Sequence, residues 1–436
     1  MINNKVTYLY SNEDNFDQKL NEFLRTRNIS NVDIEKNVFD ITNQIKRHGD
    51  NALIPMINKF DNITCSNLGD ITIENKLLKK AFDDLPIDLK NAMKIASSRI
   101  KSFHEKQKLS GFEYEDELGV NLGLKYSPIK RVGLYTPGGK AFYPSSVLMN
   151  ALPALVAGVE ERVLVSPINI EKSSEILLAA AYLAEVTEFY RMGGAHAIAA
   201  LAFGTKDLKK VDKIVGPGNA YVAEAKRQLF GKVGIDSVAG PSEVLIVADN
   251  ENNPEWIAID LLSQAEHDEN AQSILITNDK KFAKLVEDQV AKLLENLPRK
   301  QIASTSWYNN GLVLIVENLR ECIDIINHIA PEHLQFCIEN PKVYLDKIKN
   351  AGSIFLGKYT PEAIGDYIAG PNHVLPTEGT ARFSSGLGTN DFLRRTTFVQ
   401  CNEHNLNDLG KHAEILAEAE GLDAHRMSIY ARRKDN

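Results

Sequence analysis

Side chains that enzymes use for acid–base work and metal binding gather in a few short segments of this chain. The segment GDYIAGPNHVLPT (365–377) contains Asp366, Tyr367 and His373. Its two prolines lack an amide donor and restrict the residues before them, so we predict a loop without helix or strand. Such a loop is either an ordinary surface turn or a binding segment held by a rigid scaffold, and this segment alone does not decide between the two.

The segment LLSQAEHD (261–268) carries an amide and a histidine at helical spacing. If a helix beginning at Pro254 continues through it, Gln264 and His267 lie on one face. An amide oxygen and an imidazole nitrogen on one face can share a metal ion. A solvent-facing or capping role is the commoner alternative.

The segment APEHL (330–334) places two candidate general bases side by side. Pro331 suits the first turn of a helix, and Glu332 there would interact favourably with the helix dipole. Glu332 and His333 would point in different directions on a helix, and they could act on different protons of one substrate. The alternative is a plain helix start.

Near the chain end, AEAEGLDAHRMS (417–428) adds Glu420 and His425, just after a predicted acidic helix (407–419). Together these segments offer nitrogen and oxygen donors without sulfur, a set typical of zinc or a neighbouring divalent metal in a catalytic site. The chain has four cysteines, and none of them forms a C-x-x-C pair, so they resemble small apolar residues of a reducing compartment.

Strands alternate with helices of about ten residues from residue 131 onward, which predicts parallel, doubly wound α/β sheets. The predicted strands are 132–135, 162–166, 188–192, 211–215, 244–249, 273–277, 311–316 and 353–357. The predicted helices are 145–158, 175–184, 195–203, 219–229, 254–266 and 282–297. Turns TPGG (136–139) and GPGN (216–219) follow two of the strands, where an open α/β sheet binds ligands and a helix start attracts anions. Plain turns have the same spacing.

The bulk properties exclude several classes of protein. A length of 436 residues predicts two domains with appendages. A net charge of −8 argues against a nucleic-acid partner. The N-terminal residues do not form a signal peptide, and no apolar run is long enough for a membrane helix, so we expect a cytoplasmic protein.

These motifs in this order resemble the histidinol dehydrogenase family. The resemblance runs from about Asn31 to about Ile429 and rests on RVGLYTPGG, YPSSVLM, KIVGPGNAYV, AGPSEVLI, LLSQAEHD, APEHL, GDYIAGPNHVLPT and the late AH. It implies two incomplete Rossmann-like doubly wound domains with small helical arms. The expected division is an N-terminal arm (1–30), a zinc and substrate domain (31–134 with 244–385), an NAD domain (135–243) and a C-terminal arm (386–436).

The resemblance also implies an activity and a set of site residues. The activity is oxidation of L-histidinol through L-histidinal to L-histidine with two NAD, in a homodimer whose C-terminal arm enters the partner's site. The zinc ligands implied are Gln264, His267, Asp366 and, from the second subunit, His425. Substrate contacts implied are Ser242, His333 and Glu420 with those ligands, and NAD contacts are Tyr135 and Asn219. Glu332 and His333 match the pair assigned to proton transfer. The alternative is a zinc-dependent hydrolase on the same fold.

One position departs from the family pattern. The family commonly has glutamine in the motif written here GGAHAIAAL, where this chain has His196. Histidine can still make one hydrogen bond to the cofactor, but its charge varies near neutral pH. We therefore expect a slightly altered and pH-dependent affinity for NAD.

Overall fold

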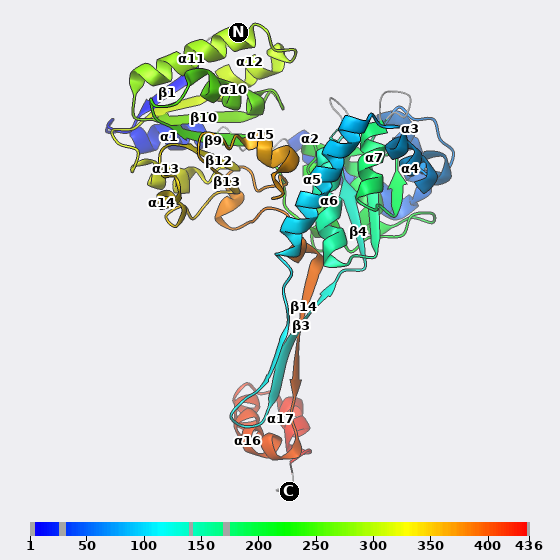
Figure 1. The fold of residues 1–436 in the computed structure, drawn as a ribbon. Coiled ribbons are helices and arrows are strands. Elements are labelled where there is room, and N and C mark those ends of the chain that lie inside the picture. The colour runs from blue at the N-terminus through cyan, green and yellow to red at the C-terminus, as the bar shows by residue number, and fades with distance from the viewer. Residues whose placement is uncertain (1–4, 26–31, 139–142, 169–174, 434–436) are drawn as a thin grey trace.

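The chain folds around two separate parallel sheets, with a long ribbon leading to its C-terminal helices (Figure 1). The computed structural model describes residues 5–25, 32–138, 143–168 and 175–433. Helices pack on both faces of each sheet. The predicted pair of doubly wound α/β units is therefore confirmed.

The first unit contains a six-stranded sheet in the order β1-β11-β10-β9-β12-β13, with every pair parallel. Its strands are β1 (Thr7–Tyr10), β9 (Glu243–Ala248), β10 (Gln272–Thr277), β11 (Leu312–Ile315), β12 (His333–Cys337) and β13 (Ser353–Leu356). Its helices are α1 (Phe16–Arg25), α10 (Pro254–Ala265), α11 (Lys280–Leu294), α12 (Lys300–Asn310), α13 (Cys322–Ile329) and α14 (Lys342–Leu345). The central strands β9 and β10 are mostly apolar and are buried along their whole length because helices cover both faces.

The second unit contains a five-stranded sheet in the order β6-β5-β4-β7-β8. Its strands are β4 (Arg131–Tyr135), β5 (Glu161–Val165), β6 (Glu188–Tyr190), β7 (Lys213–Val215) and β8 (Gly234–Ile235). On one face lie α4 (Asn75–Asp84), α5 (Ile87–Glu105), α6 (Pro144–Ala157) and α7 (Glu175–Leu183). On the other lie α2 (Val32–His48), α3 (Asp50–Phe60), η1 (Leu68–Ile71), α8 (Gly194–Phe203) and α9 (Ala220–Leu229).

This packing differs from the expected division of the chain. Residues 32–105 were assigned to the zinc domain, but their helices cover both faces of the five-stranded sheet. Residues 1–30 were expected to form an arm, but β1 is the edge strand of the six-stranded sheet and α1 packs on it through Phe16 and Leu20. The apolar faces of these N-terminal elements are buried against sheets, which periodicity alone could not assign to one sheet or the other.

Two local predictions are corrected. The helix expected at Pro331 is absent: Ala330 adopts a left-handed conformation with φ 51°, and β12 begins at His333. Pairing with β9 and β13 on both sides outweighs the helix-start signal. The loop predicted at 365–377 begins with regular structure, because α15 (Glu362–Ile364) continues into a π-helical turn, η2 (Gly365–Ala369).

A ribbon of antiparallel strands carries the C-terminal helices away from both sheets (Figure 1). Its strands are β2 (Phe112–Glu115), β3 (Asn121–Pro128) and β14 (Leu393–Gln400). Short turns η3 (Thr380–Arg382) and η4 (Thr389–Phe392) precede it, and α16 (Glu403–Ala419) and α17 (Asp423–Tyr430) follow. The predicted acidic helix is confirmed as part of α16. No helix in the described residues has the length and apolar character needed to cross a membrane.

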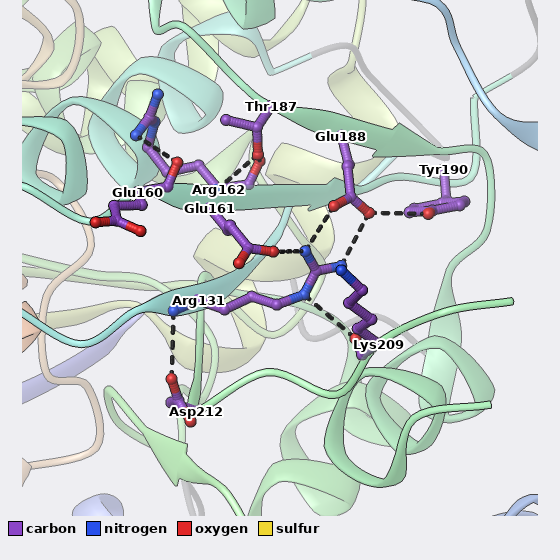
Figure 2. A network of polar contacts seen from close by, with 9 residues as sticks. All are labelled: Arg131, Glu160, Glu161, Arg162, Thr187, Glu188, Tyr190, Lys209 and Asp212. Atoms are coloured by element: carbon purple, nitrogen blue, oxygen red, sulfur yellow. Dashed lines mark hydrogen bonds and ion pairs between the residues drawn. The ribbon is translucent and has the colours of Figure 1, made fainter. Parts of the chain in front are cut away.

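A buried arginine and two half-buried glutamates join the first residues of three strands in the five-stranded sheet (Figure 2). The Arg131 guanidinium donates to Glu161 at 2.5 Å and to both carboxylate oxygens of Glu188 at 2.6 and 2.8 Å. Lys209 accepts a further bond through its backbone oxygen. The network fastens the amino edge of this sheet, the edge opposite Tyr135, so we regard it as structural.

Candidate active site

The candidate acid–base residues lie at the amino edge of the six-stranded sheet. His333 is the first residue of β12 and is paired in register with Val244 of β9. Ser242 and Glu332 immediately precede these two strands. Gln264 and His267 lie at the end of α10, in the connection that leads to β10. Five predicted site residues from distant parts of the chain therefore reach the same edge of one sheet.

Glu332 and His333 are both buried and are held by the backbone of one residue, Glu243. The backbone amide of Glu243 donates to Glu332 Oε2 at 2.8 Å. His333 Nδ1 lies 2.9 Å from the carbonyl oxygen of the same residue. The distance from His333 Nδ1 to Glu332 Oε2 is 3.6 Å. Although successive residues of a strand diverge, these two side chains remain neighbours.

The contacts of His333 determine which ring nitrogen is available as a base. A carbonyl oxygen only accepts, so Nδ1 carries the proton and Nε2 carries the lone pair. Nε2 is buried, has no hydrogen-bond partner among the described residues, and lies 3.7 Å from Asp366 Oδ1. Burial lowers the pKa of His333, which favours its neutral form. The ring is thus a neutral base with its free nitrogen toward Asp366.

Asp366 lies in the π-helical turn η2, a rare conformation that is frequent at functional sites. Its Oδ1 is buried without a hydrogen-bond partner in the described part of the chain. His373 Nδ1 lies 3.9 Å from this oxygen and 3.1 Å from the backbone oxygen of Asp366. His373 Nε2 lies 3.2 Å from Ser146 Oγ of α6. His373 therefore braces the turn against the other unit.

The donor atoms expected to hold zinc fit a cation. Gln264 is 1% exposed, and its Oε1, like Asp366 Oδ1, is a buried oxygen with no hydrogen-bond partner among the described residues. Leaving such oxygens unpaired is costly, and a cation would satisfy both. Burial lowers the pKa of His267, while nearby Asp366 opposes that shift, so its neutral, metal-binding form is favoured. The predicted helix ends at Ala265, one residue early, and a turn from His267 N to Gln264 O at 3.1 Å keeps the two residues together.

The sequence reading missed Glu362. This buried carboxylate lies 3.6 Å from His333 Nδ1, and one ligand atom each from Glu362, His333 and Asp366 lies within 4.8 Å of the others. Burial, and then the charges of Asp366 and Asp260, raise the pKa of Glu362 well above its usual range. The available signal was its spacing, because Glu362 and Asp366 are four residues apart, about one helical turn.

The candidate NAD residues lie at the carboxyl edge of the five-stranded sheet. Tyr135 ends β4, and its carbonyl oxygen accepts from Asn150 Nδ2 at 3.1 Å. Gly216 follows β7 with φ 111°, and a Cβ there would lie 2.1 Å from the Tyr135 oxygen, so only glycine fits. Asn219 caps α9 by accepting from the amides of residues 221 and 222. Of the TPGG turn, Gly139 lies outside the described residues.

His196 does not stand free in the NAD region. Its Nε2 lies 2.8 Å from Asp61 Oδ2, and both side chains are at most 5% exposed. The same carboxylate accepts from the Gly193 amide at 3.3 Å. The next amide, of Gly194, donates to the Tyr135 hydroxyl at 3.2 Å. His196 is therefore linked to the predicted cofactor residue Tyr135 indirectly, through Asp61 and the first backbone amides of α8.

Glu420 and His425 are not brought to this site within one chain. Both are exposed, Glu420 at the end of α16 and His425 on α17. These helices lie at the far end of the ribbon from both sheets (Figure 1).

Comparison with known proteins agrees with the motifs. The histidinol dehydrogenase family profile matches residues 24–433. The chain is 50% identical to histidinol dehydrogenase 1 of Trichormus variabilis over 97% of its length and 98% of the relative's. It is 48% identical to histidinol dehydrogenase of Nitrosomonas europaea, covering 98% and 99%. A crystal structure of histidinol dehydrogenase from Elizabethkingia anophelis matches with TM-score 0.90 and 36% identity over 98% of both chains. The chain therefore belongs to the histidinol dehydrogenase family.

Proposed function

We propose that this protein oxidises L-histidinol to L-histidine through L-histidinal, with zinc and two molecules of NAD. The observation that carries the proposal is the juxtaposition of His333 Nε2 and Asp366 Oδ1, 3.7 Å apart, buried and without hydrogen-bond partners among the described residues. A free imidazole base beside a free carboxylate oxygen suits a substrate bound by a metal and deprotonated beside it. Family membership supports the same reaction.

The zinc ligands that we propose are Gln264, His267 and Asp366, with His425 of a second subunit. When bound, zinc would hold and polarise the substrate without exchanging electrons. Ser242, His333 and, from the second subunit, Glu420 would contact the substrate beside these ligands. Tyr135 and Asn219 would contact NAD, which accepts one hydride in each oxidation.

In the first oxidation, His333 Nε2 takes the proton of the substrate hydroxyl as the hydride leaves. The bond from Nδ1 to the Glu243 carbonyl oxygen holds the ring in the required tautomer and stabilises it once it is protonated. Holding the carbinol carbon against NAD should lower the activation barrier by several kcal/mol. Well-oriented reactants can gain up to roughly 7–11 kcal/mol in this way.

In the second oxidation, the aldehyde first adds water. Glu332 removes a proton from that water. His333, after releasing its first proton to solvent, then removes a proton from the hydrate as the second hydride leaves. No cysteine takes part: Cys337, the cysteine of β12, is buried, and burial raises the pKa of its thiol to about 12. A thiolate nucleophile is therefore disfavoured there.

The proposal is tested by NADH formation. Protein incubated with L-histidinol and NAD should produce absorbance near 340 nm, with two NADH per histidinol. Prior removal of metal with a chelator should lower the rate about 100-fold or more, because a Lewis-acidic metal supplies several kcal/mol of stabilisation, and added zinc should restore the rate. Hydrolysis of an ester or amide of histidine, with no NADH formed, would instead support the zinc hydrolase.

We further propose that two copies exchange their C-terminal arms. On this arm, Ile415, Leu416 and Met427 are 63%, 66% and 59% exposed. Three large apolar side chains this exposed on one pair of helices favour a contact with another surface. The arm also holds Glu420 and His425, which the chain does not bring to its own site. Mixing an inactive His333→Asn protein with an inactive His425→Asn protein should restore activity if the arm serves the partner's site.

The pair formed by His196 and Asp61 predicts an effect of His196 on NAD binding. The His196 ring holds the Asp61 carboxylate, which also accepts from the Gly193 amide, beside the start of α8, where an anionic cofactor would approach. His196→Gln should therefore raise the Michaelis constant for NAD about two- to fivefold, an effect of roughly one hydrogen bond. Measuring this constant for the variant and its parent from pH 6 to 9 tests the prediction, and identical profiles would reject it.

A further inference from the structure

The loop that carries Asp366 is attached to the five-stranded unit, although its carboxylate serves the amino edge of the six-stranded sheet. Arg99 of α5 donates from Nε to the Ile368 backbone oxygen at 2.7 Å and from Nη2 to the Ala369 oxygen at 3.0 Å. Both oxygens belong to the π-helical turn η2, which also contains Asp366. A guanidinium is suited to this contact because its donors form a rigid planar fork.

The loop beyond η2 is attached to α6 of the same unit. Asn372 Nδ2 donates to the Met149 backbone oxygen at 2.6 Å, and His373 contacts Ser146. Val374 is 5% exposed and belongs to the core of that unit. The segment after Asp366 is therefore anchored to α5 and α6.

Close approach of the turn to α5 depends on Gly370. This residue has φ 119°, and a Cβ there would lie 3.0 Å from the Arg99 backbone oxygen. Glycine tolerates this conformation and this proximity. The turn thus ends directly against the helix that carries Arg99.

The conformation of the backbone must fix the position of the Asp366 carboxylate. Its Oδ1 has no hydrogen-bond partner among the described residues that would orient it, and its neighbours His333 and His373 lie beyond 3.5 Å. A π-helical turn has weaker internal support than an α-helix, so external donors to its terminal carbonyls matter. Within the described residues, Arg99 is the side chain seen to donate to the last two carbonyls of η2.

We propose that Arg99 is a positioning residue for the zinc ligand Asp366, and that it couples zinc affinity to the packing of the turn on α5. The inference rests on the proposed function, because it takes Asp366 as a ligand. Arg99 is exposed and contacts neither substrate nor cofactor in this scheme. Its action on the metal is therefore exerted through the turn.

The test uses the full-length protein loaded with zinc and, separately, with cobalt. Arg99→Met removes the two donated bonds, and Arg99→Lys retains one. Lys108→Met is the matched control, since it removes a positive charge just beyond α5 without removing a bond to η2. Zinc release to an excess of a chromogenic chelator is followed over time, and the visible spectrum of the cobalt protein reports the ligand geometry.

Arg99→Met should release zinc about 10–100-fold faster than the unmodified protein, the range typical of residues that orient metal ligands. Its cobalt spectrum should change, Arg99→Lys should be intermediate, and Lys108→Met should match the parent. Thermal unfolding of the metal-free proteins should be nearly equal because Arg99 is exposed. Equal zinc release and equal cobalt spectra in Arg99→Met and its parent would overturn the inference. An unmodified protein that binds no zinc would instead refute the proposed function.

Discussion

His333→Asn should lower turnover about 10²–10⁴-fold in both oxidations, because one general base serves both proton removals. His333 is buried, and its Nδ1 bond to the Glu243 carbonyl leaves Nε2 as the only basic nitrogen. Asparagine can keep the bond to the carbonyl but offers no basic nitrogen in its place. Histidinol oxidation and histidinal oxidation are measured separately by NADH formation from each substrate.

His328→Asn is the matched control for this prediction. His328 is an exposed histidine of α13, outside the site, and its Nε2 contacts Asn21 at 2.9 Å. It should retain parental rates with both substrates. If His333→Asn retained histidinal oxidation, another group would have to serve as the base for the second hydride transfer.

Glu332→Gln should lower histidinal oxidation about 10²–10⁴-fold while leaving the first oxidation within about tenfold of the parental rate. Only the second oxidation requires a proton to be taken from water. Glutamine can still accept the Glu243 amide bond that Glu332 Oε2 accepts at 2.8 Å, so the local structure should persist. The measurement is a pair of single-substrate rates, with Glu339→Gln, an exposed glutamate past β12, as the control. Equal losses in both oxidations would contradict the assignment.

We also predict the effect of Glu332→Gln on thermal stability at alkaline pH. Burial, assisted by the charges of Glu243, Glu362 and Asp366, raises the pKa of Glu332. A carboxyl whose pKa is raised on folding lowers stability as pH increases from its unfolded pKa to its folded pKa. Metal-free Glu332→Gln should therefore unfold at the same or a higher temperature than the parent at pH 8. Its loss of activity would then not come from unfolding.

The raised pKa of Glu332 also predicts how the rate of histidinal oxidation by the parental enzyme changes with pH. Glu332 acts as a base only when ionised, so histidinal oxidation should rise with pH through its raised pKa. Glu332→Gln should lack this rise.

The sequence by itself determined the fold class, the family and most of the candidate site. Alternating strands and helices predicted the two doubly wound units because each period depends only on nearby residues. The segments around Gln264, Glu332 and Asp366 stood out because glycine, proline and ionisable residues are rare in such combinations. The sequence did not single out Glu362, whose environment depends on burial beside distant residues.

Only the tertiary structure decided how these segments meet. The helices of residues 32–105 proved to cover the five-stranded sheet, and residues 333–337 became a strand because β9 and β13 offered pairing on both sides. The amino edge of one sheet supplies His333, and the carboxyl edge of the other supplies Tyr135. The attachment of the Asp366 loop to Arg99 spans about 270 residues of chain. Local patterns carry no information about such contacts, since their energy comes from surfaces that meet only after folding.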